Sequence, residues 1–491
     1  MTDSPAYRLP TDPKEQPILD RILTIRDHLS ILKLDRSTYV KSQDVMTYYN
    51  QLIEEVEKLN VIRETKRDEQ NRVDTVLDDC FQLISLFFMT IGRNQEAPAV
   101  YSAISTVKRL LDHLKEAGFY SPKDLESISH HIEQWQQAVE RGRDEHSLQL
   151  LTLLDARIEV CRHILVELRD NLSKLSPEMM ETYERLVSIL RSLSALNTRS
   201  KVRQTCFSSW QPNTDQLQFP VKEVNDFEQQ LLEIQSQLHG SRDSHEGKSA
   251  EQVYAERLQQ LSLHESTDGP TVVHGLLARC LLWVEIIQAK KGKIDDRFHD
   301  TYDKLLKIRN TLEQMNLTQA WSLRETDLYS YQRQLDRIDE GRVHGNFLDP
   351  EGRPADLHAQ RTLLYLLRKS YACIYQYIVS SEPVSEALLP IYNQLLTLKR
   401  CLVEVQRSGG VDSPRELYPY SMKLNSIDNM KKDGKFMVGN DIPEGQASVT
   451  ALLAECFDIA YELREQSQQE EEEETAAPGG VEATNGVEVA G

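Results

Sequence analysis

Three pairs of cations, each a few residues after a tyrosine, have the chemistry of an anion site. They are Lys108 with Arg109, Lys307 with Arg309, and Lys399 with Arg400. If the helices that carry them lie in parallel register, these side chains would form a basic groove able to hold a phosphate or a phosphopeptide. The competing interpretation places the cations on solvated helix faces, paired with nearby glutamates. Anion binding through the first two pairs is kept as the alternative function.

A small basic and apolar spot near the C-terminus is the second candidate. It comprises Lys431, Lys432, Lys435, Phe436 and Met437. It lies in the Gly-punctuated segment 417–440, and long connections without regular structure inside a domain tend to be functional or well packed. Two interpretations stay open, an ordered strap between helices and a binding loop. We take this spot, together with Lys399 and Arg400, as the candidate partner-binding surface.

Motifs of catalysis are absent from the sequence. There is no G-x-G-x-x-G, no G-x-x-x-x-G-K-[ST], no H-E-x-x-H and no G-x-S-x-G, so phosphate loops, zinc proteases and nucleophile elbows are not indicated. His130 and His131 are adjacent, so on a helix they would point about 100° apart. Three cysteines at positions 80, 280 and 456 lie among apolar neighbours and are expected in a core. We therefore predict no catalytic residue, no cofactor and no metal.

The elements that carry these residues are predicted to be helices. Proline is absent between residues 17 and 98, 122 and 177, and 270 and 350, and an interior proline would cost a helix about 3 kcal/mol. Ser121-Pro122 and Ser176-Pro177 are typical helix starts, with a capping hydroxyl before a proline in the first turn. Alternating β-branched runs are nearly absent. The fold class is therefore all-α.

Five segments share one spacing, with a tyrosine, an aliphatic residue at +3 and a leucine at +10. The tyrosines are Tyr49, Tyr101, Tyr183, Tyr302 and Tyr392. These positions fall on one stripe of a helix, so we expect the stripes to pack together and to leave no reaction centre. Four antiparallel hairpins are predicted, at 76–93 with 97–116, 153–173 with 177–196, 275–292 with 296–316, and 361–380 with 386–406. Stacked, they would form a multi-helix bundle or an irregular solenoid. The uneven spacing leaves common ancestry and convergent patterning equally open.

Composition narrows the partners and the compartment. The formal charge of the 491 residues is −20, and eight acids after Arg464 leave −12 for residues 1–464. Nucleic acids and anionic lipids need clustered cations, so neither is an expected partner. The most apolar run, Leu83 to Ile91, is about half of the ~20 residues that a membrane span needs. Seven scattered cysteines without a C-x-x-C pair suit a reducing compartment. We expect the cytoplasm, and the nucleus is not excluded.

The domain organisation follows from the loops and the proline borders. We expect a flexible N-terminus (1–15), an N-terminal helical bundle (16–205), an ordered connector (206–223), a second helical unit (224–416) with mobile loops at 240–250 and 341–356, an irregular loop (417–440), a C-terminal helix (441–465) that begins at an Asp441/Glu444 capping box, and a disordered acidic tail (466–491).

Residues 416–465, ELYPYSMKLNSIDNMKKDGKFMVGNDIPEGQASVTALLAECFDIAYELRE, resemble the most distinctive stretch of a fungal family of uncharacterised cytosolic and nuclear proteins that share a domain of unknown function. The helices around RIEVCRHIL and RCLLWVE fit the same family, so the likeness spans about residues 15–465. It implies an all-helical fold and supplies no catalytic residue.

The function that these observations favour is a non-enzymatic helical scaffold. Its helix grooves and the 417–440 segment would bind another protein, whose identity the sequence does not reveal. The alternative is the anion- or phosphopeptide-binding adaptor.

Overall fold

The computed structural model describes residues 8–63, 70–198, 220–238, 269–318 and 323–476, with the backbone alone for 316–318 and 470–476. Throughout these residues the regular structure is α-helical, with short 3₁₀ helices and four isolated β-bridges. The all-α prediction is confirmed. The predicted helix starts also form, because the Ser121 hydroxyl accepts from the Asp124 N–H (3.3 Å) and the Ser176 hydroxyl from the Met179 N–H (3.4 Å).

The chain divides into two compact units. Unit 1 comprises Met1–Asp35, Thr47–Phe88 and Asn94–Ser381, and unit 2 comprises Arg36–Met46, Met89–Arg93 and Glu382–Gly491. This corrects the expected division at the 206–223 connector, because helices from both sides of it pack in one unit. Residues 206–219 of that connector and the predicted loop 240–250 lie outside the described residues. The predicted hairpin of 361–380 with 386–406 falls across the two units.

Unit 1 holds the helices up to residue 379. They are α1 (Gln16–Leu34), α2 (Ser42–Arg63, whose first turn belongs to unit 2), α3 (Arg72–Thr90, whose last residues do likewise), α4 (Val100–Ala117), α5 (Pro122–Arg141), α6 (Leu148–Ser173), α7 (Pro177–Asn197), α8 (Val221–Leu238), α10 (Gly269–Lys290), α11 (His299–Thr318), α12 (Leu328–Glu340) and α13 (Leu357–Val379). Within this unit α4 packs on α6, α7 on α10, and α11 on α13.

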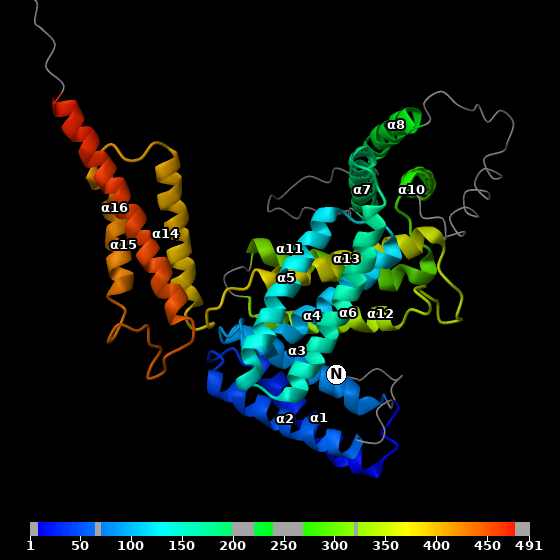
Figure 1. Cartoon of the computed structure of the whole chain (residues 1–491), viewed down its shortest axis with the longest axis horizontal. Helices are drawn as coiled ribbons and strands as arrows, with labels where there is room; N and C mark the ends of the chain where they lie inside the picture. The colour runs from blue at the N-terminus through cyan, green and yellow to red at the C-terminus, as the bar shows by residue number, and fades with distance from the viewer. Residues whose placement is uncertain (1–7, 64–69, 199–219, 239–268, 319–322, 477–491) are drawn as a thin grey trace, which may run out of the picture. The chain divides into compact units, whose positions relative to one another are not determined.

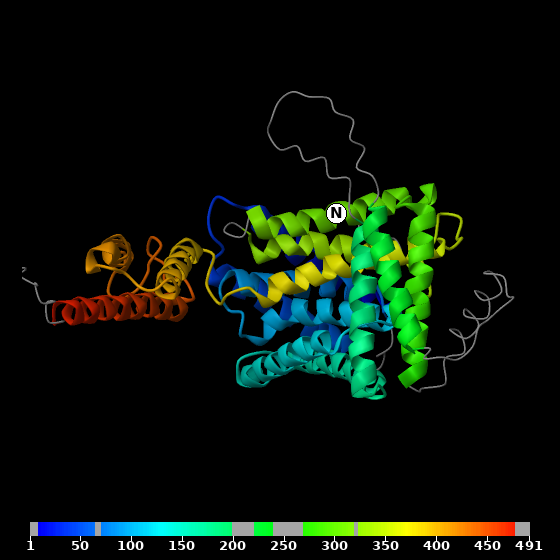
Figure 2. The same ribbon diagram turned by 90° about the horizontal axis from the view of Figure 1, so that it is seen from above.

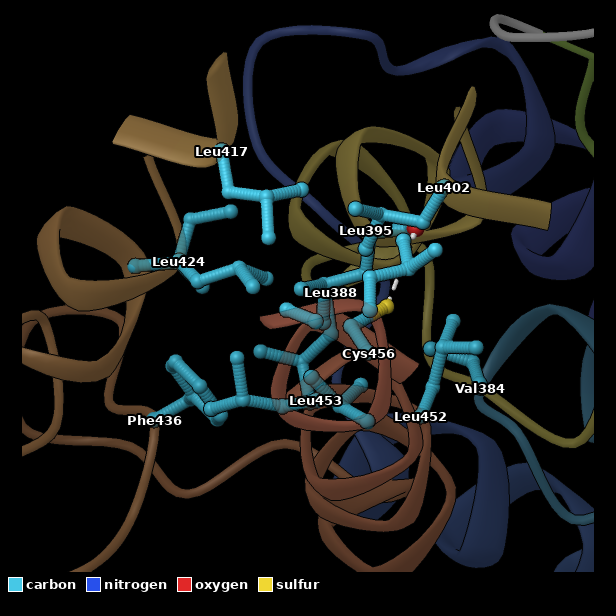
Figure 3. Packing of buried hydrophobic residues seen from close by; sticks show 14 of the residues in the cluster. Val384, Leu388, Leu395, Leu402, Leu417, Leu424, Phe436, Leu452, Leu453 and Cys456 are labelled. Carbon is cyan, nitrogen blue, oxygen red and sulfur yellow. Dashed lines mark hydrogen bonds between the residues drawn. The ribbon is translucent and has the colours of Figure 1, made fainter. Parts of the chain in front are cut away.

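Unit 2 is built on three helices, drawn in orange to red in Figures 1 and 2. They are α14 (Leu389–Arg407), α15 (Tyr418–Asp428) and α16 (Gln446–Ala476). Each packs against the other two. Figure 3 shows how Leu388, Leu417, Leu424, Phe436 and Leu453 point into one apolar cluster between these helices.

The structure corrects four sequence-based expectations for unit 2. The 417–440 segment is not irregular throughout, because Tyr418–Asp428 is a helix that buries Leu424 and Ile427. The last helix begins at Gln446, not at residue 441. The two acids of the expected capping box bond other residues instead. The Asp441 carboxylate accepts from the Tyr39 hydroxyl (2.7 Å), and Glu444 accepts from Arg93 (3.0 Å). Helix α16 also extends to Ala476, into the expected disordered tail; residues 477–491 lie outside the described part.

A three-helix arrangement recurs along the chain. The first helix packs on the third in four triplets: α4–α5–α6, α7–α8–α10, α11–α12–α13 and α14–α15–α16. The helices α1, α2 and α3 follow one another along the chain as a fifth triplet. A thiol in the third helix donates to the first: Cys80 to the Ile22 carbonyl (3.8 Å), Cys280 to Leu186 (3.8 Å) and Cys456 to Leu395 (3.5 Å). In each case the acceptor residue lies three positions after an equivalent residue of the first helix. These equivalent residues are Leu19, Tyr183 and Tyr392. We call each such triplet a module and number them 1 to 5.

These three-helix modules change the interpretation of the tyrosine pattern in two respects. Tyr49 lies in α2, a second helix, and Leu19 holds the position that Tyr101, Tyr183, Tyr302 and Tyr392 hold in the other modules. In every module an aliphatic residue seven positions before the cysteine position is buried: Val73, Leu154, Val273, Leu363 and Val449. In module 4 the cysteine position is Ser370. The recurring unit is therefore a helix triplet, not the hairpin expected from the sequence.

Modules 4 and 5 agree in detail at the turn after their second helix. In module 4, the backbone N–H of Phe347 donates to the Gln360 side chain (2.9 Å), and that side chain donates to the Phe347 carbonyl (3.0 Å). In module 5, Phe436 and Gln446 make the same two bonds, at 2.9 and 2.8 Å. We call 342–347 and 431–436 the clamped turns. The loop 341–356, expected to be mobile, thus contains the same hydrogen-bonded turn as the 417–440 segment.

The positive φ values of the clamped turns also match. They are 50° and 78° at His344 and Gly345, and 50° and 76° at Asp433 and Gly434. Glycine takes such a φ at no steric cost, so Gly345 and Gly434 explain why the chain can turn there. Phe347 and Phe436 then enter the core of their modules.

One helix of the described residues, α10, is long and apolar enough to cross a membrane. This corrects the expectation from the sequence, which placed the most apolar run at Leu83–Ile91. In the structure, α10 packs against α7 and α8 and buries Val273, Leu277, Cys280 and Trp283. This packing accounts for its apolar composition.

Candidate functional site

The cations expected to form a basic groove are paired within their own surroundings. Lys108 bonds Asp112 (2.8 Å), and Arg309 bonds Glu313 (3.2 Å) and the Thr198 carbonyl (3.0 Å). Lys307 is exposed on α11. In unit 2, Lys399 bonds Glu455 (2.5 Å), and Arg400 is exposed. The competing interpretation, acid-paired cations on helix faces, therefore describes most of these residues.

The basic and apolar spot at 431–437 divides into a buried and an exposed part. Phe436 is 1% exposed and belongs to the core of unit 2, so its assignment as a partner-binding residue is corrected. Lys431 bonds Asp428 (2.8 Å) and lies 5.4 Å from the centre of the Phe436 ring. Met437 is half-buried, and Lys432 and Lys435 are exposed. Only the two lysines are fully available to a partner.

Helix α15 presents an exposed face that its counterpart in module 4 buries. With the clamped turns in register, Tyr418 of α15 matches Tyr329 of α12, and Met422 matches Arg333. Tyr329 and Arg333 are 3% and 9% exposed, whereas Tyr418 and Met422 are 65% and 54% exposed. The same helix position is thus covered in one module and open in the other.

Two further large apolar side chains of unit 2 are exposed. Met430, two residues after α15, and Tyr461, on α16, are 54% and 61% exposed. Tyr461 matches Tyr375 of module 4, whose hydroxyl contacts His131 at 2.8 Å. Lys423 on α15 and Lys432 and Lys435 in the following clamped turn are also exposed, and none of them has an ion-pair partner within the described residues. We call Tyr418, Met422, Met430 and these three lysines the α15 surface.

A polar cavity of about 610 Å³ lies within unit 1. Its lining comes from α3, α4, α6, α12 and α13 and from the residues just before α3. The charged side chains among the lining are Asp74, Asp78, Lys108, Arg109, Arg157, Arg333, Asp336 and Glu340. The sequence alone does not indicate this cavity. Lys108 and Arg109 are the two candidates that it holds.

The walls of the cavity are a network of ion pairs and hydrogen bonds. Asp78 accepts from the Tyr101 hydroxyl (2.6 Å) and from Arg157 (2.9 Å), whose guanidinium lies 4.3 Å from the centre of the Tyr101 ring. Asp336 accepts from the Tyr371 hydroxyl (2.6 Å), with Arg333 at 3.7 Å. The tyrosine stripe therefore packs as expected at Tyr101, but its hydroxyl faces a carboxylate.

Burial controls the ionisation of this network. Loss of solvent raises the pKa of Asp336 to about 6, although Arg109 and Arg333 favour its charged form. Burial also raises the pKa of Tyr101 well above its ordinary value. Asp336 therefore changes its protonation state near pH 6, well above an ordinary surface aspartate.

Two buried cysteines have raised pKa values, and the two adjacent histidines lie side by side. Burial raises the pKa of Cys280 to about 12 and that of Cys456 to about 11, so these thiols are poor nucleophiles. His130 and His131 have ring centres 5.8 Å apart. In the part of the chain that the structure describes, no group of three or more His, Cys, Asp or Glu residues could hold a metal.

Two all-helical units of recurring three-helix modules define the class of protein. Residues 172–325 and 381–478 match a family described as a protein of unknown function, DUF2408. A CUB1 family protein of Schizosaccharomyces pombe is 36% identical over 475 residues, 95% of this chain and 96% of the relative. The Cu(2+) suppressing and bleomycin sensitive protein 1 of Saccharomyces cerevisiae is 35% identical over 516 residues, 94% of this chain and 92% of the relative. No solved structure matches.

The chain belongs to this family. The resemblance to an uncharacterised fungal family, inferred from residues 416–465, is confirmed.

Proposed function

We propose that this protein is a non-enzymatic helical scaffold that binds another protein through the α15 surface. The observation that carries the proposal is the contrast between two matched helices. The α12 face is covered by α3 and α4, since Arg333 bonds Asp79 (2.8 Å) and Gln332 bonds Ser102 (2.8 Å). The α15 face carries tyrosine and methionine in the open.

The partner is an acidic amphipathic helix. A helix is the element that covers the matched face in module 4, and methionine-rich surfaces accept apolar helix faces. Lys423, Lys432 and Lys435 would pair with acids flanking the apolar stripe of that helix. This retains two of the lysines predicted from the sequence and replaces Phe436 by Tyr418 and Met422.

The proposed location is a reducing compartment, and nucleic acid and anionic membranes are not proposed as partners. The six cysteines described as free support a reducing compartment, the cytoplasm, with the nucleus left open. The net charge of −20 argues against nucleic acid or an anionic membrane as partner. The name of the S. cerevisiae relative refers to copper suppression and bleomycin sensitivity. A scaffold could influence both through the protein that it holds.

The alternative, an anion- or phosphopeptide-binding adaptor, has less support. It needs Lys108, Arg309 and Arg400 to act together. Lys108 and Arg309 are already paired with acids, and no observation favours a shared groove.

The test uses the full chain with a photo-crosslinking residue in place of Met422 or, as control, of Val166. The control is well matched, because both side chains are apolar and 54% exposed. We expect the Met422 position to crosslink to an acidic helical segment of another protein and the Val166 position not to. The double variant Met422→Glu, Met430→Glu should abolish that partner in affinity purification, whereas Val166→Glu should retain it.

Two results would contradict the proposed binding of a separate partner. If the crosslinks from position 422 map to the same chain or to a second copy of it, no separate partner covers the α15 surface. Partner binding that survives the double variant would also refute the proposal. Hydrogen exchange of α16 peptides should be unchanged in both variants, which separates lost binding from lost folding.

A further inference from the structure

Three serines that are followed by proline lie within the described residues, at Ser121, Ser176 and Ser413. Ser-Pro is the dipeptide that proline-directed protein kinases modify, and a proline brings no backbone N–H that would stay unpaired in the kinase cleft. Each of the three serines precedes a helix, and its hydroxyl accepts a backbone N–H there. Their surroundings differ, and this difference decides which serine a kinase reaches in the folded chain.

Packing holds the first two serines on their N-terminal side. Tyr120 and Leu175, the residues directly before Ser121 and Ser176, are 5% and 8% exposed. Ser121 is fixed further by its own N–H, which donates to the Asp124 carboxylate (2.9 Å). A kinase, like a protease, needs the chain on both sides of its target to be accessible. Burial of the preceding residue therefore hinders it at both positions.

Ser413 lies in a segment that is open on both sides. None of the residues 412–416 is buried, and the Ser413 backbone is extended, with φ −145° and ψ 140°. Its hydroxyl makes one hydrogen bond within the described residues, from the Arg415 N–H at 3.4 Å. Upstream, Gly409 and Gly410 have φ values of 107° and 88°, and a Cβ at either position would have no atom within 4 Å.

Val411 is the residue that a kinase would have to displace. It is 7% exposed, whereas the other residues of 408–416 are half-buried or exposed. Release of one valine is a local opening and leaves the rest of the module folded. The two glycines before it let the chain bend away without steric strain. The Ser413 hydroxyl is therefore the most accessible of the three to a kinase.

Ser413 is also close to the α15 surface. The 3₁₀ helix η6 (Pro414–Leu417) joins it directly to Tyr418, and Leu417, 3% exposed, anchors this joint in the core. With a rise of about 2 Å per residue, Ser413 lies roughly 10 Å from Tyr418 along the chain. A phosphate there adds about two negative charges. The exposed lysines of the clamped turn follow the other end of α15, about 16 Å further on and thus beyond the screening length, so they do not neutralise it.

We propose that Ser413 is a phosphorylation site of a proline-directed kinase, and that its phosphate weakens binding of the acidic partner at the α15 surface. The kinase transfers the γ-phosphoryl group of ATP to the Ser413 Oγ. ADP leaves, and the hydroxyl proton passes to the catalytic aspartate of the kinase. Repulsion between the phosphate and the acids of the partner produces the effect on binding. The second part rests on the proposed scaffold function, and the first part does not.

The first experiment treats the purified full chain with a proline-directed kinase and Mg-ATP and maps the phosphate by mass spectrometry. A Ser4→Ala change in every chain removes the remaining Ser-Pro pair, which lies outside the described residues. We expect Ser413 to be labelled about tenfold faster than Ser121 and Ser176, because only those two need a packed preceding residue to open. Synthetic peptides centred on the three serines should be labelled at similar rates.

Pro414→Ala keeps the Ser413 hydroxyl and should slow its labelling by roughly tenfold, as selection of the dipeptide requires. Hydrogen exchange of α16 peptides shows that this variant is folded. If Ser413 is not labelled in the folded chain, or if Ser121 or Ser176 is labelled as fast, the site is wrongly assigned.

The second experiment compares kinase-treated and untreated chains in the crosslinking assay at position 422, at low salt. The treated chain should give roughly threefold less crosslinked partner, and treated Ser413→Ala should give as much as the untreated chain. Equal yields from the phosphorylated and untreated chains would refute the effect on binding and leave both the site and the scaffold function standing. If the untreated chain captures no partner, the scaffold function fails and the effect on binding fails with it, while the labelling of Ser413 still decides the site.

Discussion

Replacement of Phe436 by alanine distinguishes a core residue from a surface residue at the clamped turn of module 5. The Phe436 ring is 1% exposed and packs in the cluster with Leu424 and Leu453 (Figure 3). Truncating a buried phenylalanine costs about 3–5 kcal/mol. The loss of the Lys431 contact, at 5.4 Å from the ring centre, adds about 0.5–1 kcal/mol at most.

The assay is hydrogen exchange followed by mass spectrometry, because a chain of two units need not unfold in one step. A loss of 3–5 kcal/mol should speed exchange through opening of unit 2 by roughly 10²- to 10³-fold or more, since about 1.4 kcal/mol is tenfold. The change should appear in peptides from α15 and α16. The neighbouring Met437 is half-buried, so Met437→Ala should change exchange there by less than about tenfold.

Module 4 supplies a second arm of the same experiment. Phe347 occupies the matching turn and is 5% exposed, so Phe347→Ala should speed exchange in α12 and α13 instead. If Phe436→Ala leaves α15 and α16 as protected as Met437→Ala does, Phe436 is not a core residue. The surface interpretation of the 431–437 spot would then stand.

Two further predictions concern ionisation. Because burial raises the pKa of Asp336 to about 6, above the ordinary value near 4, the folded state binds more protons in that window and the free energy of unfolding should fall as pH rises from about 4 to about 6. Asp336→Asn, which keeps an acceptor for Tyr371, should flatten this slope in urea unfolding; an unchanged slope would mean that another group is responsible. Among the described cysteines, Cys401 is exposed and Cys80, Cys280 and Cys456 are buried, so a maleimide should label Cys401 in the native protein and the other three only on unfolding, as peptide mapping would show. Equal labelling rates would contradict the packed module cores.

Local patterns foretold the helices well, because helix formation depends on residues close in the chain. Proline borders, serine caps and the tyrosine spacing indicated most helix positions, including the starts at Pro122 and Pro177. The failures occurred where a distant contact competes with a local signal. Asp441 and Glu444 have the spacing of a capping box, but Tyr39 and Arg93 engage their side chains, so the helix begins later.

The clamped turns were visible in the sequence only in hindsight. Gly345-Asn346-Phe347 and Gly434-Lys435-Phe436 share a glycine and a phenylalanine two residues later. Their common structure depends on a glutamine that lies 13 residues after the phenylalanine in one turn and 10 in the other. No fixed local spacing connects these residues, so a search for regular periods could not find them.

By itself, the amino-acid sequence determined that this protein is all-helical, acidic and built from amphipathic helices with buried tyrosine and cysteine positions, because these properties follow from residue type and a period of 3.6. Only the tertiary structure decided which positions gather. It covers α12 and leaves the matched α15 face open, and it brings Asp78, Arg157, Arg333 and Asp336 from three helices to one cavity. Such charges look alike on any helix face until the packing of other helices removes them from water.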